Sequence, residues 1–539
     1  MWRAQNVLPA WMFFPVFFVF VMLSHITLLR LPYFWDESGY YIPAALDFYH
    51  AHALVPYTTL NTGHTPLSSV LLAAWWHLSG PVPTGTRIAC CMVTAFALTA
   101  VYRLARNLIG ELAALAVTLL TAIYPVWFAQ STLAHSDLFA AAFTLWGLVF
   151  YFEGRPPALM RKGRKRTLRI FAALFFSLAI LSKETALITP FSLALWEMAC
   201  YLRTDDLKQR RSSQLWLVTF TVPAVVLAGW CLYHLHLTGH LFGDSGYLRY
   251  NAFGTLTPQR MGLGLFYRAL HLTAHMNLFV PVLCALAALL LVPLPDHDGN
   301  PRHGISPLIL GGIFAVLLGH WIFFSVMGGA LLTRYLLPAY PLVILLCVAT
   351  WRRRVREWWL LSIFSAAAFL SGLVLNPPYH FAPEDNLTYR AVIILQQQAI
   401  WQIVHRYPHA TVLTAWPASD ELRKPELGYL RQPLAVYRIA DFSQAQLELA
   451  ASAPEQYDTA LLFSTKYDPP SLHQRDETLS TKYLEFHHDL FPAEAGRLLH
   501  GTIVWQAERN GEWAAVLHFD RIVDARLNTT SPYSEKSSF

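Results

Sequence analysis

Long apolar stretches recur along roughly the first 375 residues of this 539-residue chain, separated by short polar or Pro/Gly-rich breaks. A helix that crosses the hydrocarbon layer of a bilayer needs about 20 apolar residues, and these stretches approach that length. They fall near residues 9–29, 86–102, 111–128, 137–152, 169–182, 186–201, 215–236, 276–293, 307–326, 335–350 and 357–375. The pattern predicts a mainly α fold, a polytopic membrane helical bundle of about eleven spans.

Basic residues in the loops give this predicted bundle a direction. They cluster at Arg103 and Arg106, at 155–169, at 203–211 and at 352–356. Cytoplasmic loops of membrane proteins are enriched in Lys and Arg, so we expect these four loops on the cytoplasmic side. An odd number of spans then places everything after residue 375 on the opposite, extracytoplasmic side.

Two longer segments, 30–85 and 237–275, lie on the outer side in this arrangement. The apolar run at 67–78, within the first of them, is too short to cross a bilayer comfortably. Counting it as a span would also move Arg103 and Arg106 outside. We therefore expect an interfacial helix there, lying along the membrane surface.

The composition becomes that of a soluble protein after Asn376-Pro377-Pro378. A helical stretch at 387–405 is followed by β-like runs at 411–416, 459–464, 501–505 and 514–519. The predicted domains are therefore a transmembrane domain (1–375), a small extracytoplasmic α/β domain (376–527) and a Ser/Thr-rich tail (528–539) that we expect to be disordered.

Composition narrows the class of protein further. With 55% hydrophobic and 14% charged residues, the chain is too apolar for an ordinary soluble protein. The net charge of +6 does not indicate nucleic-acid binding, because the basic residues lie in loops beside apolar helices. All six cysteines fall inside apolar segments, so no disulfide framework is visible. No ATP-binding loop, structural zinc spacing or serine hydrolase motif is present.

Acidic residues stand at the outer ends of two predicted helices. Asp36 and Glu37 follow the first helix directly, within reach of a lipid headgroup, unless they are ordinary solvated loop acids. Asp137 opens the helix at 137–152, where it caps the helix, faces a cavity or does both. His64, in N-T-G-H-T-P-L before the interfacial helix, either contacts substrate or is an ordinary interfacial histidine.

Basic residues occupy the same side. Lys183 and Glu184 lie at the outer tip of a helical hairpin, where isolated charges usually face a cavity or a partner, unless they snorkel to the interface. Arg334 and Tyr335 open a later helix and either bind substrate or anchor the helix at the interface. Arg249 lies between tyrosines in an outer loop, as a phosphate or sugar contact or as part of a lipid-facing aromatic belt.

This grouping of charges indicates chemistry on a lipid-linked substrate. Cations suit the phosphate of a lipid, and carboxylates suit a hydroxyl nucleophile. A transporter or lipid flippase is the main alternative, and it would need charges at mid-membrane in several helices. A sensor is a further alternative, in which the outer domain would bind a ligand.

Five motifs together carry a resemblance to a known family. They are W-D-E after the first helix, G-H-T-P-L before the interfacial helix, H-S-D-L at the start of the fourth helix, L-S-K-E-T in the hairpin and R-Y-L-L-P-A-Y-P in the tenth helix. With these motifs the chain resembles the GT-C membrane glycosyltransferases. Within that class it resembles specifically the dolichyl-phosphate-mannose protein mannosyltransferases and their bacterial aminoarabinose-transferase relatives.

The resemblance implies that a sugar is moved, with inversion, from a polyprenyl-phosphate carrier to an acceptor hydroxyl at the extracytoplasmic membrane face. It also implies that the first outer loop contains short interfacial helices that lie along the membrane surface. It further implies that Asp36 is the catalytic acid, and we expect Glu37 and Asp137 to take part. The residues expected to bind substrate are His64, Lys183, Glu184, Arg249, Arg334 and Tyr335.

The expected partners are a polyprenyl-phosphate sugar, membrane lipids and an acceptor that is a protein, a lipid or a glycan. No cofactor is expected. A divalent metal could bridge Asp36 and Asp137, but the nearby cations make one unnecessary. The expected location is a bacterial inner membrane, with the active site and the C-terminal domain on the periplasmic side.

Overall fold

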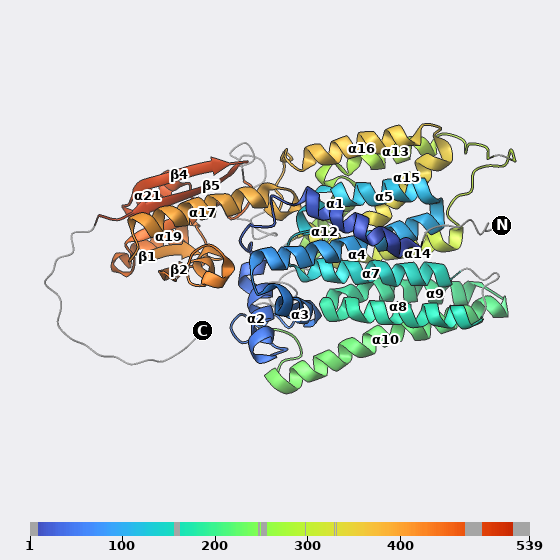
Figure 1. Cartoon of the computed structure of the whole chain (residues 1–539), viewed down its shortest axis with the longest axis horizontal. Coiled ribbons are helices and arrows are strands. Elements are labelled where there is room, and N and C mark those ends of the chain that lie inside the picture. Colours follow the sequence, from blue (N-terminus) through green and yellow to red (C-terminus); the bar gives the residue numbers. More distant parts are fainter. Residues whose placement is uncertain are drawn as a thin grey trace.

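The computed structural model describes residues 9–155, 162–245, 248, 256–296, 298–327, 329, 331–468 and 488–520. Its long helices run side by side and form a bundle, and a smaller α/β unit extends from one end of that bundle (Figure 1). The structure therefore confirms a mainly α fold with a small C-terminal sheet.

Each of the eleven apolar stretches overlaps a helix of the bundle. These helices are α1 (Phe14–Ser24), α4 (Pro83–Ile109), α5 (Glu111–Ile123), α7 (Ser136–Gly154), α8 (Lys162–Ser182), α9 (Ile188–Arg203), α10 (Leu207–Thr238), α13 (Phe279–Leu289), α14 (Pro307–Val326), α15 (Tyr340–Arg354) and α16 (Trp358–Gly372). By length and apolar composition, four helices among the described residues could cross a membrane, or five if a bent pair counts as one span. The number of crossings therefore stays a prediction.

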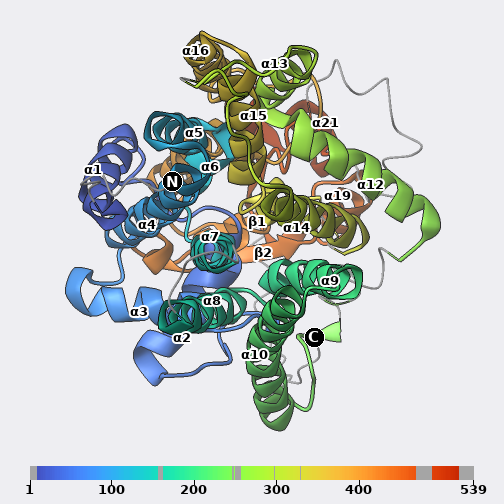
Figure 2. The same ribbon diagram turned by 90° about the vertical axis from the view of Figure 1, so that its right-hand side faces the viewer.

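Helix α12 (Pro258–Thr273) was not predicted, because its stretch carries Arg260, two glycines and Arg268 and was assigned to an outer loop. Its buried face includes Arg260 and Arg268, and it packs on α14. The helix pair Pro258–Asn277 and Phe279–Leu289 is bent by 100°. Figure 2 looks along the bundle, so that α7 is seen end-on. Helix α12 is seen along its length in this view and therefore runs across the direction of the bundle.

The first outer segment contains two short helices that pack against each other, α2 (Ile42–Ala51) and α3 (Leu67–Ser79). Helix α3 is the helix expected at 67–78, and α2 is a further short helix in the loop where the resemblance implies such helices, although its bounds were not predicted. A π-helical turn, η2 (Glu37–Tyr41), leads directly into α2. The acids of the W-D-E motif thus stand at the start of a continuous helical segment.

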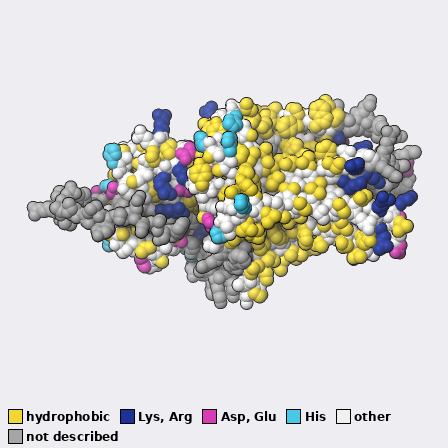
Figure 3. Space-filling view, turned by 90° about the horizontal axis from the view of Figure 1, so that it is seen from below, with side chains coloured by type: hydrophobic (Ala, Val, Ile, Leu, Met, Phe, Trp, Pro, Cys, Tyr) yellow, Lys and Arg dark blue, Asp and Glu magenta, His cyan; other side chains and the backbone are white. Residues whose placement is uncertain are grey.

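The surface of the bundle is apolar along its length and basic at one end. Apolar side chains cover its length, and Lys and Arg gather at the end away from the α/β unit (Figure 3). Helices α4, α9 and α15 carry Arg106, Arg203 and Arg352 to Arg354 in their last turns. The chain is an integral membrane protein with one basic end.

The α/β unit is built on a five-stranded sheet in the order β2-β1-β3-β5-β4. The strands are β1 (Thr411–Ala415), β2 (Ala435–Ile439), β3 (Thr459–Phe463), β4 (Thr502–Arg509) and β5 (Glu512–His518). Strands β1, β2 and β3 are parallel, whereas β5 is antiparallel to β3 and β4. Four of the five strands and the helix α17 (Thr388–Arg406) were predicted. The missed strand, β2, is a largely uncovered edge strand.

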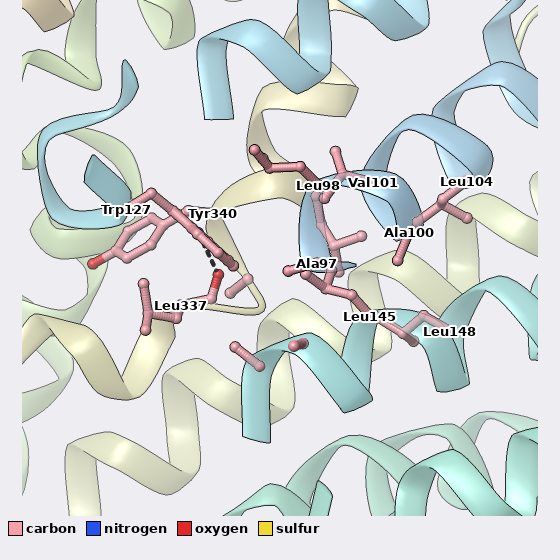
Figure 4. Close-up of a cluster of buried hydrophobic side chains, with 14 of the residues drawn as sticks. Ala97, Leu98, Ala100, Val101, Leu104, Trp127, Leu145, Leu148, Leu337 and Tyr340 are labelled. Atoms are coloured by element: carbon pink, nitrogen blue, oxygen red, sulfur yellow. Dashed lines mark hydrogen bonds between the residues drawn. The ribbon is translucent and has the colours of Figure 1, made fainter. Parts of the chain in front are cut away.

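Two apolar cores hold the molecule together, one through the bundle and one around the sheet. In the bundle core, α4 packs on α7, and Ala97 and Ala100 of α4 belong to the same buried cluster as Leu145 and Leu148 of α7 (Figure 4). The limits predicted for the domains, after residues 375 and 527, stay predictions. The predicted tail at 528–539 lies outside the described residues.

Candidate active site

Five charged side chains meet where the bundle joins the α/β unit. Arg334, in the short helix η6 (Thr333–Leu336), is only 3% exposed and contacts three carboxylates. It donates hydrogen bonds to Asp36 and to Glu384, and its Nε lies 3.3 Å from Asp137 Oδ2. Lys183 Nζ donates to both Asp137 oxygens, at 2.7 and 2.8 Å. We call these five residues the Arg334 cluster.

The fold fixes both cations of the cluster. Lys183 occupies the break between α8 and the helical turn η3 (Glu184–Leu187), and its Nζ lies 4.3 Å from the centre of the Tyr335 ring. The η6 segment that carries Arg334 is fixed through Leu337, whose carbonyl accepts a 2.9 Å hydrogen bond from Trp127 Nε1 (Figure 4). Packing of the helices therefore brings the cations together.

The Arg334 cluster contains three carboxylates and two cations, so it has one acid in excess. Glu384, in the turn η7 (Pro383–Asp385), is deeply buried. Burial raises the pKa of Glu384 to about 8, and the adjacent Arg334 offsets only part of that effect. Glu384 therefore holds a proton near neutral pH. Asp36 has the most exposed side chain of the three acids, at 18%.

Glu37 belongs to a separate, closed arrangement. It is fully buried, and its Oε1 accepts a hydrogen bond from Arg87 Nη1 at 2.8 Å. Backbone N–H groups of Phe34 and Ala134 donate to the same carboxylate at 2.8 and 2.6 Å. These contacts anchor the loop and leave the carboxylate no exposed oxygen, so they argue against the catalytic part expected for Glu37.

The α/β unit packs directly against the backbone around Asp36. The ring of Trp416 lies 5.5 Å from the ring of Trp35, edge to face, and 5.5 Å from that of Tyr40. A Cβ placed on Gly39 would lie 2.6 Å from the Trp416 ring, so this close approach requires glycine. The C-terminal unit thus helps to position the segment that carries Asp36.

His64 and Glu184 form a second pair beside the cluster. His64 Nδ1 lies 3.0 Å from Glu184 Oε2, and both side chains are partly exposed. The ring of Tyr41 stacks at 6.2 Å from the His64 ring. This brings the G-H-T-P-L and L-S-K-E-T motifs into contact, as a shared site requires.

The structure places the other predicted residues as follows. Asp137 lies inside the first turn of α7 and binds Lys183, so it does not cap the helix. Ser136, directly before Asp137, also lies inside the helix, and its hydroxyl lies 2.7 Å from that of Ser68. The face of the Tyr335 ring contacts the ammonium group of Lys183. Arg249 lies outside the described residues.

Three residues of this region were missed: Glu384, Arg87 and His135. Glu384 offered a signal, because Glu384-Asp385 follows the last apolar stretch much as Asp36-Glu37 follows the first. Arg87 opens an apolar helix, where a single arginine has many interpretations. His135 is the first residue of the H-S-D-L motif, in which only Asp137 was predicted to belong to the site.

No group of three or more His, Cys, Asp or Glu side chains within the described ranges is placed to hold a metal ion. Arg334 already stands among the three carboxylates of the cluster and occupies the central position between them. Metal independence nevertheless stays a prediction.

Comparisons with known proteins show what this chain is similar to. Residues 63–234 match the sequence model of a family described as dolichyl-phosphate-mannose-protein mannosyltransferase. The range includes Asp137, Lys183 and the His64–Glu184 pair. No curated protein sequence matches the chain significantly.

Two solved structures of ArnT from Cupriavidus metallidurans have a similar fold. The one bound to undecaprenyl phosphate has a TM-score of 0.56 at 15% identity, covering 95% of this chain and 98% of that chain. The apo structure has a TM-score of 0.56 at 14% identity, covering 94% and 98%. The fold is thus similar over nearly the whole length of both proteins.

The resemblance that the motifs indicated is therefore confirmed. Both findings are consistent with a GT-C membrane glycosyltransferase, the class of protein that the motifs resemble. More particularly, the chain is similar to the mannosyltransferase family over residues 63–234 and to ArnT in its overall fold. None of these findings supports the transporter alternative.

Proposed function

We propose that this protein transfers a sugar from a polyprenyl-phosphate carrier to an acceptor hydroxyl at the extracytoplasmic face of the membrane, with inversion at the sugar. The observation that carries the proposal is the Arg334 cluster, in which two cations and three carboxylates meet at the end of a membrane bundle. The cations of the cluster suit a phosphate leaving group, and its carboxylates suit a hydroxyl nucleophile.

Lys183 and Arg334 act on the phosphate. Cleavage of the sugar–phosphate bond leaves negative charge on the lipid phosphate, and fixed cations in a poorly hydrated site stabilise that charge strongly. Both cations are paired with carboxylates, so an arriving phosphate competes with those carboxylates for the N–H donors. The ArnT structure with undecaprenyl phosphate supports a lipid phosphate as the donor's anchor.

Asp36 acts on the acceptor. It is the most accessible carboxylate of the cluster and it stands at the start of the first outer helical segment. It accepts the proton of the attacking hydroxyl, whose oxygen displaces the phosphate from the opposite face of the sugar. A single displacement of this kind inverts the anomeric centre. Asp137 positions both cations and so supports the reaction indirectly.

The finer topology belongs to the same proposal. Eleven crossings place the Arg334 cluster and the α/β unit on the periplasmic side of a bacterial inner membrane, and the basic helix ends in the cytoplasm. Single cysteines at exposed Ser452 and exposed Gly163 test this in intact cells. A reagent that cannot cross the inner membrane should label the first only; labelling of the second alone would overturn the orientation.

The reaction itself is tested with purified protein in lipid vesicles and polyprenyl-phosphate sugars extracted from the source membranes. Mass spectrometry should detect loss of one sugar-linked lipid, release of polyprenyl phosphate and a product of increased mass. The sugar, hexosyl or pentosyl, and the acceptor would be identified in the same experiment. Movement of an intact lipid-linked sugar across the bilayer, without release of polyprenyl phosphate, would contradict the proposal and support a flippase.

A further inference from the structure

His135 is a buried histidine with a hydrogen-bond partner, among the described residues, at only one of its two ring nitrogens. The residue directly precedes α7 and is fully buried. Its Nδ1 lies 2.8 Å from Gln130 Oε1, but its Nε2, also buried, has no hydrogen-bond partner among the described residues. Native structures rarely leave a buried polar atom unpaired, because it loses its hydration without any replacement. Such an atom is expected to meet a partner during function.

The position of His135 places this unpaired atom beside the candidate active site. Asp137, two residues further on, holds Lys183 of the Arg334 cluster. The ring of Tyr41 lies 5.6 Å from the His135 ring and 6.2 Å from the His64 ring, so it connects His135 with the His64–Glu184 pair. Arg87 Nη1 donates a hydrogen bond to the carbonyl of Thr132, three residues before His135, at 2.6 Å.

The surroundings decide which ring nitrogen carries the proton. Full burial lowers the pKa of His135 well below its usual range, and the positive charges of Arg334, Lys183 and Arg87 lower it further, so the imidazole is neutral. The Gln130 amide N–H donates to the Glu384 carbonyl at 3.4 Å, which turns its oxygen towards His135. His135 Nδ1 is therefore the donor in that pair. Nε2 is left with a lone pair and can only accept.

Because His135 Nε2 can only accept a hydrogen bond, its ligand must carry a hydrogen-bond donor. An ionised phosphate oxygen has no proton to donate, whereas a sugar hydroxyl does. We propose that His135 Nε2 accepts a hydrogen bond from a sugar hydroxyl, on either the donor's sugar or a sugar acceptor, and thereby contributes to sugar recognition. This inference rests on the proposed transfer function, and it assigns to His135 a binding contact distinct from the phosphate contacts of Lys183 and Arg334.

Two substitutions separate the binding contact from the structural one. His135→Asn keeps a short amide donor for Gln130 and removes the Nε2 acceptor, whereas His135→Gln offers an amide oxygen near the former Nε2 position. A matched control is His25→Asn. His25 is also buried, but its Nδ1 and Nε2 lie 2.8 and 2.9 Å from the backbone carbonyls of Val21 and Phe128.

The experiment compares affinity for undecaprenyl phosphate with affinity for the sugar donor that the parent protein consumes, both in lipid vesicles. For His135→Asn we expect unchanged affinity for undecaprenyl phosphate and a loss of about 10-fold to 100-fold with the sugar partner, partly restored in His135→Gln. If the loss falls on donor affinity, the hydroxyl belongs to the donor sugar. If it falls only on the KM for the acceptor, the hydroxyl belongs to the acceptor.

Other outcomes overturn the inference. Equal loss of affinity for undecaprenyl phosphate would assign His135 to the phosphate, and unchanged kinetics in folded His135→Asn would show that its Nε2 meets only water or protein. A loss matched by His25→Asn would indicate general destabilisation. If the parent consumes none of the lipid-linked sugars, the proposed function itself is wrong, and that result is visible before any variant is measured.

Discussion

Asp36 and Glu37 are consecutive residues, yet they belong to two different charge systems. Glu37 is fully buried and shares its oxygens among Arg87 and two backbone N–H groups. Asp36 is partly exposed and contacts Arg334, which it shares with two other acids. The first system is balanced, one acid to one base, whereas the second has an acid in excess.

The difference indicates how a membrane enzyme separates structure from chemistry. A buried ion pair with all its acceptors filled has nothing left to offer a substrate, but removing either partner leaves a charge stranded. A cluster with surplus acid can exchange one partner for a phosphate or a hydroxyl. The same division recurs at Glu384-Asp385, where Glu384 binds Arg334 and Asp385 lies 2.9 Å from His275.

The largest effect is expected for Asp36→Asn, which keeps the shape of the side chain and removes its charge. A positioned base typically contributes about 100-fold to 10,000-fold, so sugar transfer should fall by at least the lower factor. Binding of the lipid donor should persist. The measurement is transfer and donor binding on one preparation, and a near-parental transfer rate would show that Asp36 is not the base.

Glu37→Gln should act mainly on stability. It leaves the Arg87 charge buried without its counter-charge, and breaking a buried pair in this way costs about 3–5 kcal/mol. We expect a markedly lower unfolding temperature in detergent. Arg103→Gln, which breaks a pair whose arginine side chain is 29% exposed, is a matched control and should cost much less. Equal shifts for the two variants would contradict a special role for the Glu37–Arg87 pair.

Arg334→Ala and Lys183→Ala should weaken the lipid donor. Each removes a charge-assisted contact of about 1.5–3 kcal/mol, so the apparent affinity for polyprenyl phosphate should fall roughly 10-fold to 100-fold. Arg438→Ala, at an exposed arginine of β2, serves as the control. If free polyprenyl phosphate still inhibits both variants as well as the parent, these cations hold the fold together and do not bind the phosphate.

The smallest effect is a pH dependence. Burial raises the pKa of Glu384 from 4.5 to about 8, so between these values the folded protein binds a proton that the unfolded chain has released. The stability contributed by this group is therefore present at low pH and declines as the pH rises towards 8. Glu384→Gln should flatten that decline in unfolding temperature, whereas Glu455→Gln, at an exposed position, should not. A parallel decline in both variants would rule out Glu384 as the source.

Much of the fold could be predicted because lipid imposes a simple rule on sequence. A helix in the bilayer must be apolar over its length, and all eleven predicted stretches overlap helices. Helix α12 does not obey that rule, since it buries arginines against other helices and presents a mixed pattern. Strand β2 was missed because an uncovered edge strand needs no continuous apolar run.

The site was harder to predict, for a geometric reason. Loop charges placed Asp36, Asp137, Lys183 and Arg334 on one side of the membrane, and these four do meet. The pairing of Asp36 with Arg334 joins residues 298 positions apart, which no local pattern specifies. Adjacent residues at the start of a helical turn also point in different directions, so Asp36 and Glu37 separate.

The division between the two charge systems is tested most directly by measuring sugar transfer and thermal unfolding together, on matched preparations of Asp36→Asn and Glu37→Gln. We expect opposite outcomes for the two neighbours. Asp36→Asn should unfold near the parental temperature and lose at least about 100-fold in transfer rate, whereas Glu37→Gln should unfold earlier and, while still folded, transfer sugar at a rate closer to the parent's. If Glu37→Gln stays stable and loses transfer, while Asp36→Asn keeps it, the division between the two charge systems is wrong.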